Sequence, residues 1–330
     1  MLTLTERDVA AALDMKSCIA HVERAYALYA QDLLPSFYRA HGALNDRGGA
    51  FEILPCSHLD KGYFGFKYAS SYPDNPGRGL PTVASTILLC DLESGFPVAH
   101  MAANILTALK TAASPAVATK YLARPGSCVA AVLGAGFQAR YQVQGLNCVL
   151  DLKELHIHDR FPEAARKMAE WFTEEINPQV KVTVFEDADA AVETADVITT
   201  ITTSFTPVLH GAALKPGAHV NAMGSWLPDM QEIDEQTVLR AAVLATDIPE
   251  DMWQVAGDIL APLRQGLISR EHPVTRLSDI VAGKADGRRD NSQITIFESI
   301  GFSSLDIALA AAVYEEARQK GAGIEVPMFE

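Results

Sequence analysis

The stretch CVAAVLGAGFQARYQVQGLNCVL, residues 128–150, decides the fold of this chain. Its first seven residues form a short apolar run that predicts a buried strand, and a helix is expected from Phe137 onward. Between them, Gly134, Gly136 and Ala139 stand at G-x-G-x-x-A spacing. Gly134 permits a tight turn, Gly136 lets the backbone approach a pyrophosphate, and Ala139 allows the helix to pack closely on the strand. The pattern predicts a dinucleotide-binding turn at the amino end of a helix.

An acidic residue follows the next predicted strand, ELHIHD, residues 154–159. Asp159 stands near the distance from the glycine turn, about 20 residues, at which such motifs carry an acid. Its carboxylate can accept hydrogen bonds from the adenosine ribose and repels a 2′-phosphate, so we expect NAD(H) rather than NADP(H). Arg160 could pair with that phosphate instead, although we favour a solvent-facing charge for it.

Strands and helices alternate throughout the residues that follow Cys128, with further apolar strands at HVNAMG (residues 219–224) and AAVLATD (residues 241–247). This alternation predicts an α/β fold, a Rossmann-type doubly wound parallel sheet. The residues before it predict two helices, 5–13 and 15–31, and then strands at 50–54, 63–69, 82–90 and 96–101 in an antiparallel or mixed sheet. A helix over 103–122 is expected to be interrupted near Pro115, and the tail predicts an amphipathic helix over 303–320.

Composition and charge exclude several classes of protein. The 330 residues carry a net charge of −14, which opposes binding to nucleic acid or to an anionic membrane surface. The five cysteines form no CxxC pair and the histidines no HExxH motif, so we expect free thiols, no metal site and a cytoplasmic protein. The amino-terminal residues lack the apolar run of a signal peptide, and no run reaches the ~18 residues of a membrane span.

Six blocks of sequence, in this order along the chain, resemble the ornithine cyclodeaminase/μ-crystallin family. They are FKYASSYPDN, GLPTVASTILLCD, ILTALKTAAS, VLGAGFQA, HVNAMGS and DNSQITIFESIG. The resemblance implies a homodimer whose subunit has an α+β substrate-binding and dimerisation domain, residues 1–115 with 302–330, and a Rossmann dinucleotide-binding domain, residues 116–301. It also implies an enzyme of amino-acid metabolism, an oxidoreductase or a lyase that uses NAD.

The resemblance also assigns roles to residues. Arg39 and Lys110 would hold the substrate carboxylate, Lys67 would stand beside the reacting carbon, and Glu52 would contact the substrate. Lys110 stands where many members have an arginine that also binds the cofactor. The remaining cofactor contacts implied are Thr82, Phe137, Gln138, Asp159, Thr202, Val220, Asn221, Ala222, Met223 and Ser292. The glycine motif and its acid add Gly134, Gly136 and Arg160 as candidate cofactor-binding residues.

The chemistry of an imine reduction agrees with these roles. The carboxylate has to be fixed so that the C=N carbon faces the nicotinamide, and a donor has to keep the imine protonated. Nearby cations would lower the pKa of Lys67 by like-charge repulsion, which suits it to proton exchange. Lys67 and Lys110 lie in otherwise apolar patterns, and an unpaired buried lysine is rare.

One position separates the subtypes of the family. Trp226 stands where the cyclodeaminases have an aspartate that engages the substrate's distal amine, and an indole can neither pair an ammonium in a salt bridge nor move a proton. Asp229 could supply an acid from the same loop, or it could cap the next helix. We therefore expect NAD(H)-dependent reduction of a small α-imino acid to an L-amino acid, with an alanine-like substrate or iminosuccinate. A cyclodeaminase that uses NAD catalytically and releases ammonia is the first alternative, and a non-catalytic nucleotide-binding protein is the second.

Overall fold

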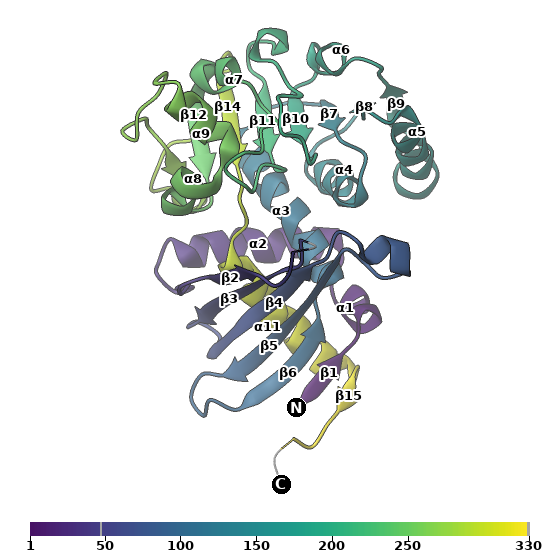
Figure 1. The fold of residues 1–330 in the computed structure, drawn as a ribbon, viewed down its shortest axis with the longest axis vertical. Helices are drawn as coiled ribbons and strands as arrows, with labels where there is room; N and C mark the ends of the chain where they lie inside the picture. Colours follow the sequence, from purple (N-terminus) through teal and green to yellow (C-terminus); the bar gives the residue numbers. More distant parts are fainter. Residues whose placement is uncertain (47, 329–330) are drawn as a thin grey trace. The chain divides into compact units, whose positions relative to one another are not determined.

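The computed structural model describes residues 1–46 and 48–328. It divides into two compact units, Met1–Lys110 with Ser303–Glu330, and Thr111–Phe302 (Figure 1). The first unit is thus discontinuous in sequence. Its boundary with the second falls inside one helix, between Lys110 and Thr111.

The first unit is built on a seven-stranded sheet with the order β15-β1-β6-β5-β4-β3-β2. Neighbouring strands are antiparallel except β1 and β6. Its elements are β1 (Leu2–Leu4), α1 (Glu6–Ala12), α2 (Met15–Tyr29), β2 (Ala40–Ala43), β3 (Ala50–His58), β4 (Tyr63–Ser71), the 3₁₀ turn Asn75–Arg78, β5 (Val83–Asp91), β6 (Pro97–Ala102), the start of α3 (Asn104–Leu122), α11 (Ser303–Lys320) and β15 (Ile324–Glu325).

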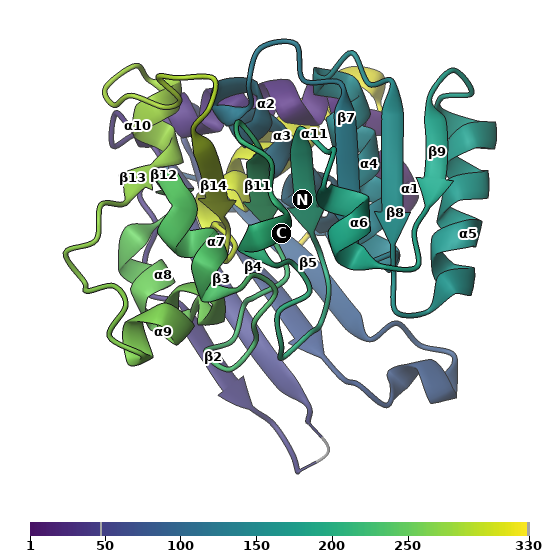
Figure 2. The same ribbon diagram turned by 90° about the horizontal axis from the view of Figure 1, so that it is seen from above.

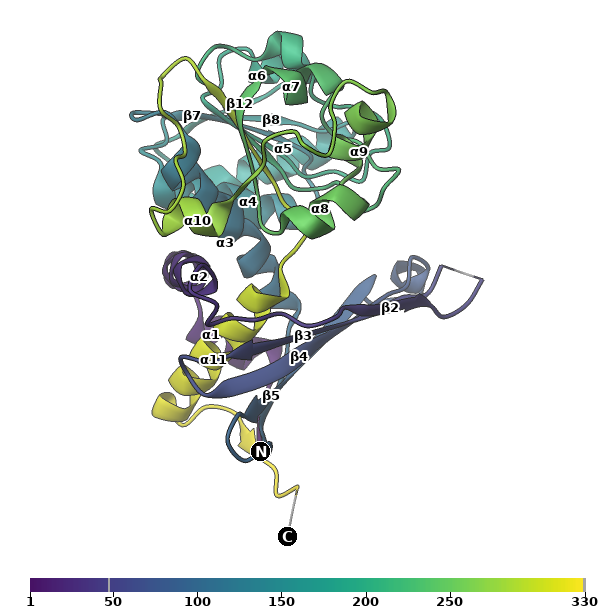
Figure 3. The same ribbon diagram turned by 90° about the vertical axis from the view of Figure 1, so that its left-hand side faces the viewer.

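Helix α11 covers one face of this sheet, where it packs against β3, β4 and β5 (Figure 3). Side chains alternate between the two faces of a strand, so every second residue of β4 points toward α11. Gly65 and Lys67 are the buried residues of β4, while Phe64, Phe66 and Tyr68 on the other face stay partly exposed. The sheet therefore has a face buried under a helix and an open face that carries aromatic side chains.

The second unit is built on an eight-stranded sheet with the order β13-β12-β14-β11-β10-β7-β8-β9. All of its neighbouring strands are parallel. Its elements are the rest of α3, β7 (Val129–Leu133), α4 (Phe137–Val149), β8 (Glu154–His158), α5 (Pro162–Trp171), the π-helical turn Phe172–Ile176, β9 (Lys181–Val184), α6 (Ala188–Val192), β10 (Val197–Thr200), the 3₁₀ turn Gly211–Ala213, β11 (His219–Ala222), α7 (Glu235–Arg240), β12 (Ala241–Thr246), α8 (Pro249–Val255), α9 (Gly257–Arg264), β13 (Thr275–Arg276), α10 (Leu277–Val281) and β14 (Ile294–Glu298).

Both faces of this parallel sheet are buried. Along β7, Ala130 and Val132 belong to one apolar cluster with α4 and α5, whereas Ala131 and Leu133 belong to another with α6 to α9. Figure 2 shows α4 and α6 on opposite sides of the strands. Strand order reverses between β7 and β10, and a doubly wound sheet binds its ligand at that point. The predicted Rossmann-type sheet is confirmed.

Helix α3 runs unbroken through Pro115, contrary to the predicted interruption. Proline removes the N–H that would bond the carbonyl four residues earlier, that of Thr111. The side-chain amide of Gln142 on α4 donates to this carbonyl at 3.1 Å instead. Gly145 lets α4 approach closely, since a Cβ there would lie 2.9 Å from the Ala112 carbonyl oxygen. A neighbouring helix thus supplies the bond that proline removes.

Candidate functional site

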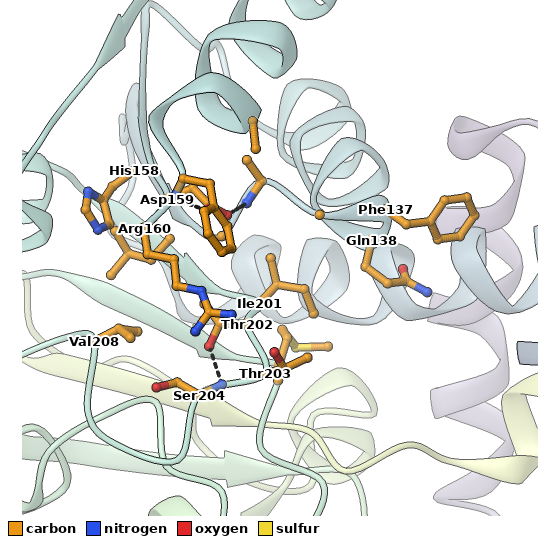
Figure 4. Close-up of a pocket in the computed structure, with 18 of the residues that line it drawn as sticks. Phe137, Gln138, His158, Asp159, Arg160, Ile201, Thr202, Thr203, Ser204 and Val208 are labelled. Atoms are coloured by element: carbon orange, nitrogen blue, oxygen red, sulfur yellow. Dashed lines mark hydrogen bonds between the residues drawn. The ribbon is translucent and has the colours of Figure 1, made fainter. Parts of the chain in front are cut away.

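A cavity of about 590 Å³ lies within the second unit, at the carboxyl ends of β7, β8, β10 and β11. Eight residues that the sequence assigned to the cofactor line it together (Figure 4). They are Gly134, Gly136, Phe137, Gln138, Asp159, Arg160, Thr202 and Met223. The cavity also has lining residues that the sequence did not single out, among them Ser204 and Val208 from the loop after β10.

The glycine turn has the geometry that a pyrophosphate needs. Gly134 has a φ of +108°, and a Cβ there would lie 2.4 Å from the carbonyl oxygen of Ile201, so no other residue fits without a shift. Gly136 begins α4 without a side-chain cap, and a Cβ there would meet open space. The first N–H groups of α4 therefore remain available to an anion at the positive end of the helix dipole.

Asp159 is held in place by two backbone N–H groups. Its Oδ2 accepts from Ala135 at 2.7 Å and its Oδ1 accepts from Phe161 at 2.8 Å (Figure 4). Each oxygen retains a lone pair that could accept from a hydroxyl group. Arg160 is exposed, lines the same cavity and stacks its guanidinium 4.7 Å from the centre of the Phe161 ring.

These residues fit a dinucleotide. The tight glycine turn, the uncapped helix and the fixed acid are the three parts of such a site. In addition, the buried Oε1 of Gln138, at the start of α4, has no hydrogen-bond partner among the described residues. A polar atom left in this way at the cavity wall indicates that a ligand group can bind there.

A buried glutamate, Glu232, holds two of the residues that line the cavity in place. Glu232 is fully buried and its carboxylate accepts hydrogen bonds from the backbone N–H groups of Thr202 and Gly224 and from the hydroxyl group of Thr200. Thr202 and Gly224 both line the cavity. Burial raises the pKa of Glu232, and the hydrogen bonds from these three residues oppose that effect. Glu232 was not among the residues that the sequence singled out, although an acid followed by Ile233 in the loop after HVNAMG was a usable signal.

Two more buried acids lie close to Glu232. The Oδ1 of Asp258 accepts from the backbone N–H groups of Glu232 and Ile233, while its Oδ2 has no hydrogen-bond partner within residues 1–46 and 48–328. In the same part of the chain, neither carboxylate oxygen of Glu298, the last residue of β14, has a hydrogen-bond partner. Burial raises the pKa of both groups, and the charge of Glu232 raises both further. The charges of Asp258 and Asp247 add to the shift of Glu298. The pKa of Asp258 is raised to about 8, so its carboxyl group is protonated at neutral pH.

Five residues that the sequence assigned to the site do not line this cavity, although they belong to the same unit. Val220, Asn221 and Ala222 are completely buried within β11, and the Asn221 amide bonds Thr119 and His219. Ser292 precedes β14 and bonds Asp290, so it lies at the amino edge of the parallel sheet, opposite the cavity. Asp229 is on an exposed turn, 3.7 Å from Arg264. Each of these positions was inferred by resemblance or proximity in sequence, without the register of the strands.

Lys67 and Lys110 meet in the first unit around a single acid, Asp306 of α11. The Nζ of Lys67 lies 3.0 Å from Oδ1 of Asp306, and the Nζ of Lys110 lies 3.3 Å from Oδ2. Burial of Lys67 lowers its pKa to about 8, with Asp306 opposing the shift and Lys110 adding to it. Burial raises the pKa of Asp306, but the two ammonium groups outweigh it, so the net pKa is below the usual value.

The other predicted substrate residues lie in the same unit. Arg39 and Glu52 form an ion pair at 3.9 Å, and both side chains are partly exposed. Glu52 shares the α11-facing side of β3 with Leu54, the register partner of Lys67, and its charge raises the pKa of Lys67 slightly. Thr82 lies in the exposed turn before β5, where its carbonyl accepts from the Tyr72 N–H.

Residues 1–46 and 48–328 include no helix that is both long enough and apolar enough to cross a membrane. In the same part of the chain, no group of three or more histidine, cysteine, aspartate and glutamate residues could hold a metal ion. None of the five cysteines, all of which lie in this part of the chain, forms a disulfide.

The chain resembles solved structures over its whole length. One is the Δ1-pyrroline-2-carboxylate reductase of Thermococcus litoralis in complex with NADH and L-proline, 34% identical with a TM-score of 0.94, covering 99% of this chain and 100% of the other. A second is an archaeal alanine dehydrogenase dimer with bound NAD, 33% identical with a TM-score of 0.92, covering 100% and 99%. A third is the iminosuccinate reductase of Paracoccus denitrificans in complex with NAD⁺, 30% identical with a TM-score of 0.92, covering 99% of each chain. The model of the ornithine cyclodeaminase/mu-crystallin family matches residues 1–321, and the chain belongs to that family.

Proposed function

We propose that this protein catalyses the NAD(H)-dependent, reversible reduction of a small α-imino acid to an L-amino acid. The observation that carries the proposal is the buried pair of ammonium groups, Lys67 and Lys110, in a chain that also has a dinucleotide cavity. Buried cations are expensive unless an anion completes their environment, and a substrate carboxylate is such an anion. The relatives named above, which are reductases of imino acids and an alanine dehydrogenase, support the same class of reaction.

The cofactor proposed is NAD(H), held by the glycine turn before α4 and by Asp159. When bound, NADH supplies a hydride, that is, one hydrogen with two electrons, to the C=N carbon. The fixed carboxylate of Asp159 favours a free ribose hydroxyl over a 2′-phosphate. The solved relatives are complexes with NADH, NAD or NAD⁺.

The substrate's carboxylate would be held by Lys110 and Arg39, and Lys67 would manage the proton. Reduction of C=N to CH–NH adds one hydride to carbon and one proton to nitrogen. A pKa of about 8 leaves Lys67 protonated at neutral pH and able to exchange that proton, so its Nζ could protonate the imine nitrogen and recover a proton from water. Asp229 has no part in this proposal, because it is exposed and faces Arg264. The substrate class is small: an alanine-like imino acid or iminosuccinate.

A cyclodeaminase reaction is the second candidate, since the family includes such enzymes. Trp226 lines the dinucleotide cavity and offers no carboxylate for a distal amine. This observation favours reduction over ring closure with loss of ammonia. A purely nucleotide-binding role is disfavoured by Lys67 and Lys110, because binding a nucleotide in the second unit gives no reason to bury two lysines in the first.

We also propose a homodimer and a cytoplasmic location. The open face of the first unit's sheet carries partly exposed Phe51, Phe66, Tyr68 and Leu88, which is the composition of a surface covered by a partner. An archaeal alanine dehydrogenase of the same fold is a dimer. Five cysteines without a disulfide among the described residues suit a reducing compartment.

The test is a panel of imino acids, formed from α-keto acids and ammonium or supplied as cyclic imines, with NADH oxidation followed by absorbance. We expect the protein to oxidise NADH with at least one imino acid of the panel. In the reverse direction, we expect it to reduce NAD⁺ with the corresponding L-amino acid. The same panel includes L-ornithine with NAD⁺. Release of ammonia from ornithine without net NADH, together with no turnover of any imino acid, would reverse the assignment to a lyase. Analytical ultracentrifugation tests the dimer separately.

A further inference from the structure

Asp306 is a fully buried acid that the proposed reaction does not yet explain. It lies in the first turn of α11, in the sequence SSLDIALAAA, with apolar residues on both sides. An acid in a first helical turn can serve as a cap. However, the hydrogen bonds that reach this carboxylate in the described chain come from Lys67 and Lys110, and none comes from a backbone N–H.

We propose that Asp306 is the positioning residue of the reaction, which holds the ammonium groups of Lys67 and Lys110, one on each carboxylate oxygen, in the arrangement that receives the substrate. The proposal rests on the proposed function and deepens it. The three residues come from different elements, β4, α3 and α11, so only the folded first unit brings them together. Asp306 therefore acts on substrate through the two lysines.

The geometry explains why one acid is enough for both lysines. The side chain of Asp306 is 0% exposed and those of Lys67 and Lys110 are 7% exposed, so all three charges are held away from water. A lysine ammonium has three N–H donors. Within the described chain, Lys67 and Lys110 each donate one hydrogen bond to Asp306. Two donors remain on each, and an acidic substrate can accept them.

The charges in the cluster also point to a substrate anion. Two ammonium groups and one carboxylate leave one positive charge, and a buried charge of this kind is stabilised when an anion binds. Glu52 of β3 is the further charged group that acts on Lys67. The thiols of Cys18 on α2 and Cys56 on β3 also face the cluster, but burial raises the pKa of both, so they stay neutral at neutral pH.

The proposal predicts that substitutions at Asp306 and at Lys110 shift the pKa of Lys67 in opposite directions. In Asp306→Asn, loss of the negative charge should lower the pKa of Lys67 below about 8, whereas in Lys110→Met, loss of the positive charge should raise it. The ¹³Cε resonance of Lys67, assigned with a Lys67→Arg variant in lysine-labelled protein, reports this titration without substrate or cofactor. Glu315→Gln is the matched control, because Glu315 pairs Lys61 on the surface of the same helix.

Activity gives the second measurement. In Asp306→Asn, kcat/KM for the imino acid should fall by about 100-fold, the scale of a misplaced catalytic group, and the alkaline limb of its pH profile should move to lower pH. Asp306→Glu, which keeps the charge, should recover part of the rate, and Glu315→Gln should match the wild type. If Asp306→Asn does not fold, two measurements still test the proposal. They are the titration of Lys67 in Lys110→Met and the pH profile of kcat/KM in Asp306→Glu.

A Lys67 resonance and a pH profile that are unchanged in Asp306→Asn would overturn the proposal, as would shifts of the same sign in Asp306→Asn and Lys110→Met. Failure of the wild type to reduce any imino acid would refute the proposed function alone. The titration of Lys67 would still report whether Asp306 controls the two lysines.

Discussion

The side-chain amide of Gln142 donates to the carbonyl oxygen of Thr111, the group that Pro115 leaves without its helical partner. This bond joins α4, which begins at the glycine turn, to α3, whose Thr111 lines the dinucleotide cavity. One contact thus stabilises both a tolerated proline and the helix that follows the glycine turn.

Gln142→Leu should lower the free energy of unfolding by about 0.5–1.5 kcal/mol, because it removes the hydrogen bond to a partly buried carbonyl oxygen. In a Pro115→Ala background the alanine N–H can bond the Thr111 carbonyl directly. Gln142→Leu should therefore lower the free energy of unfolding clearly less in that background. Urea unfolding of the four proteins of this double-mutant cycle measures the difference. An equal cost of Gln142→Leu in both backgrounds would show that the amide does not replace the missing bond.

The sequence predicted those parts of the molecule that depend on local pattern. The glycine turn at Gly134 and the parallel sheet around it follow from a strand, a turn and a helix that are adjacent in the chain. The predicted interruption at Pro115 was wrong because its compensating donor, Gln142, lies on another helix.

Partners that are distant in sequence could not be predicted. Asp306 lies 239 positions from Lys67, and no local pattern relates the two. Glu232 bonds backbone groups of Thr202 and Gly224 that only the folded sheet brings together. Ser292 shows what a local sequence block leaves open. It was assigned to the cofactor, but it comes just before β14 and so lies at the amino edge of the parallel sheet, whereas the cavity is at the carboxyl edge.

Glu232→Gln should both destabilise the second unit and weaken NADH binding. Glutamine has one acceptor oxygen where the carboxylate has two, so at least one of the donors Thr202, Thr200 and Gly224 loses its partner. A lost hydrogen bond to a charged group costs about 1.5–3 kcal/mol. Calorimetric titration with NADH and thermal unfolding measure the two effects. Glu193→Gln, at an exposed position of the same unit, is the control; if it behaves like Glu232→Gln, the role of Glu232 is refuted.

Asp159→Asn should change the cofactor preference. The neutral side chain no longer repels a 2′-phosphate, and Arg160 lines the same cavity. We expect NADH affinity to fall by about 10-fold and NADPH affinity to rise, and we expect Asp159→Asn/Arg160→Ala to lose the gain for NADPH. Fluorescence titrations with both nucleotides measure this. Asp151→Asn, next to Lys153 on the surface, controls for loss of charge. Unchanged relative affinities in Asp159→Asn would contradict the assigned role of the acid.

Asp258 should make the protein less stable as the pH rises. Burial and the charge of Glu232 raise the pKa of Asp258, so the folded chain keeps a proton that the unfolded chain has released above a pH of about 4. Stability therefore falls with rising pH until the pKa of the folded state is reached. Asparagine at this position keeps an acceptor for the N–H groups of Glu232 and Ile233 but does not titrate.

The free energy of unfolding of Asp258→Asn, minus that of the wild type at the same pH, should consequently grow between pH 5 and pH 8, by at most about 1.4 kcal/mol per pH unit. Taking the difference at each pH cancels the titration of His219, whose pKa burial lowers to about 3. Glu298→Gln should act in the same direction, because burial also raises the pKa of Glu298. Asp286→Asn, at an exposed site beside Arg289, is the control for loss of a surface carboxylate. Parallel stability curves for Asp258→Asn and the wild type would mean that Asp258 is ionised in the folded protein, and its unpartnered oxygen would then need another explanation.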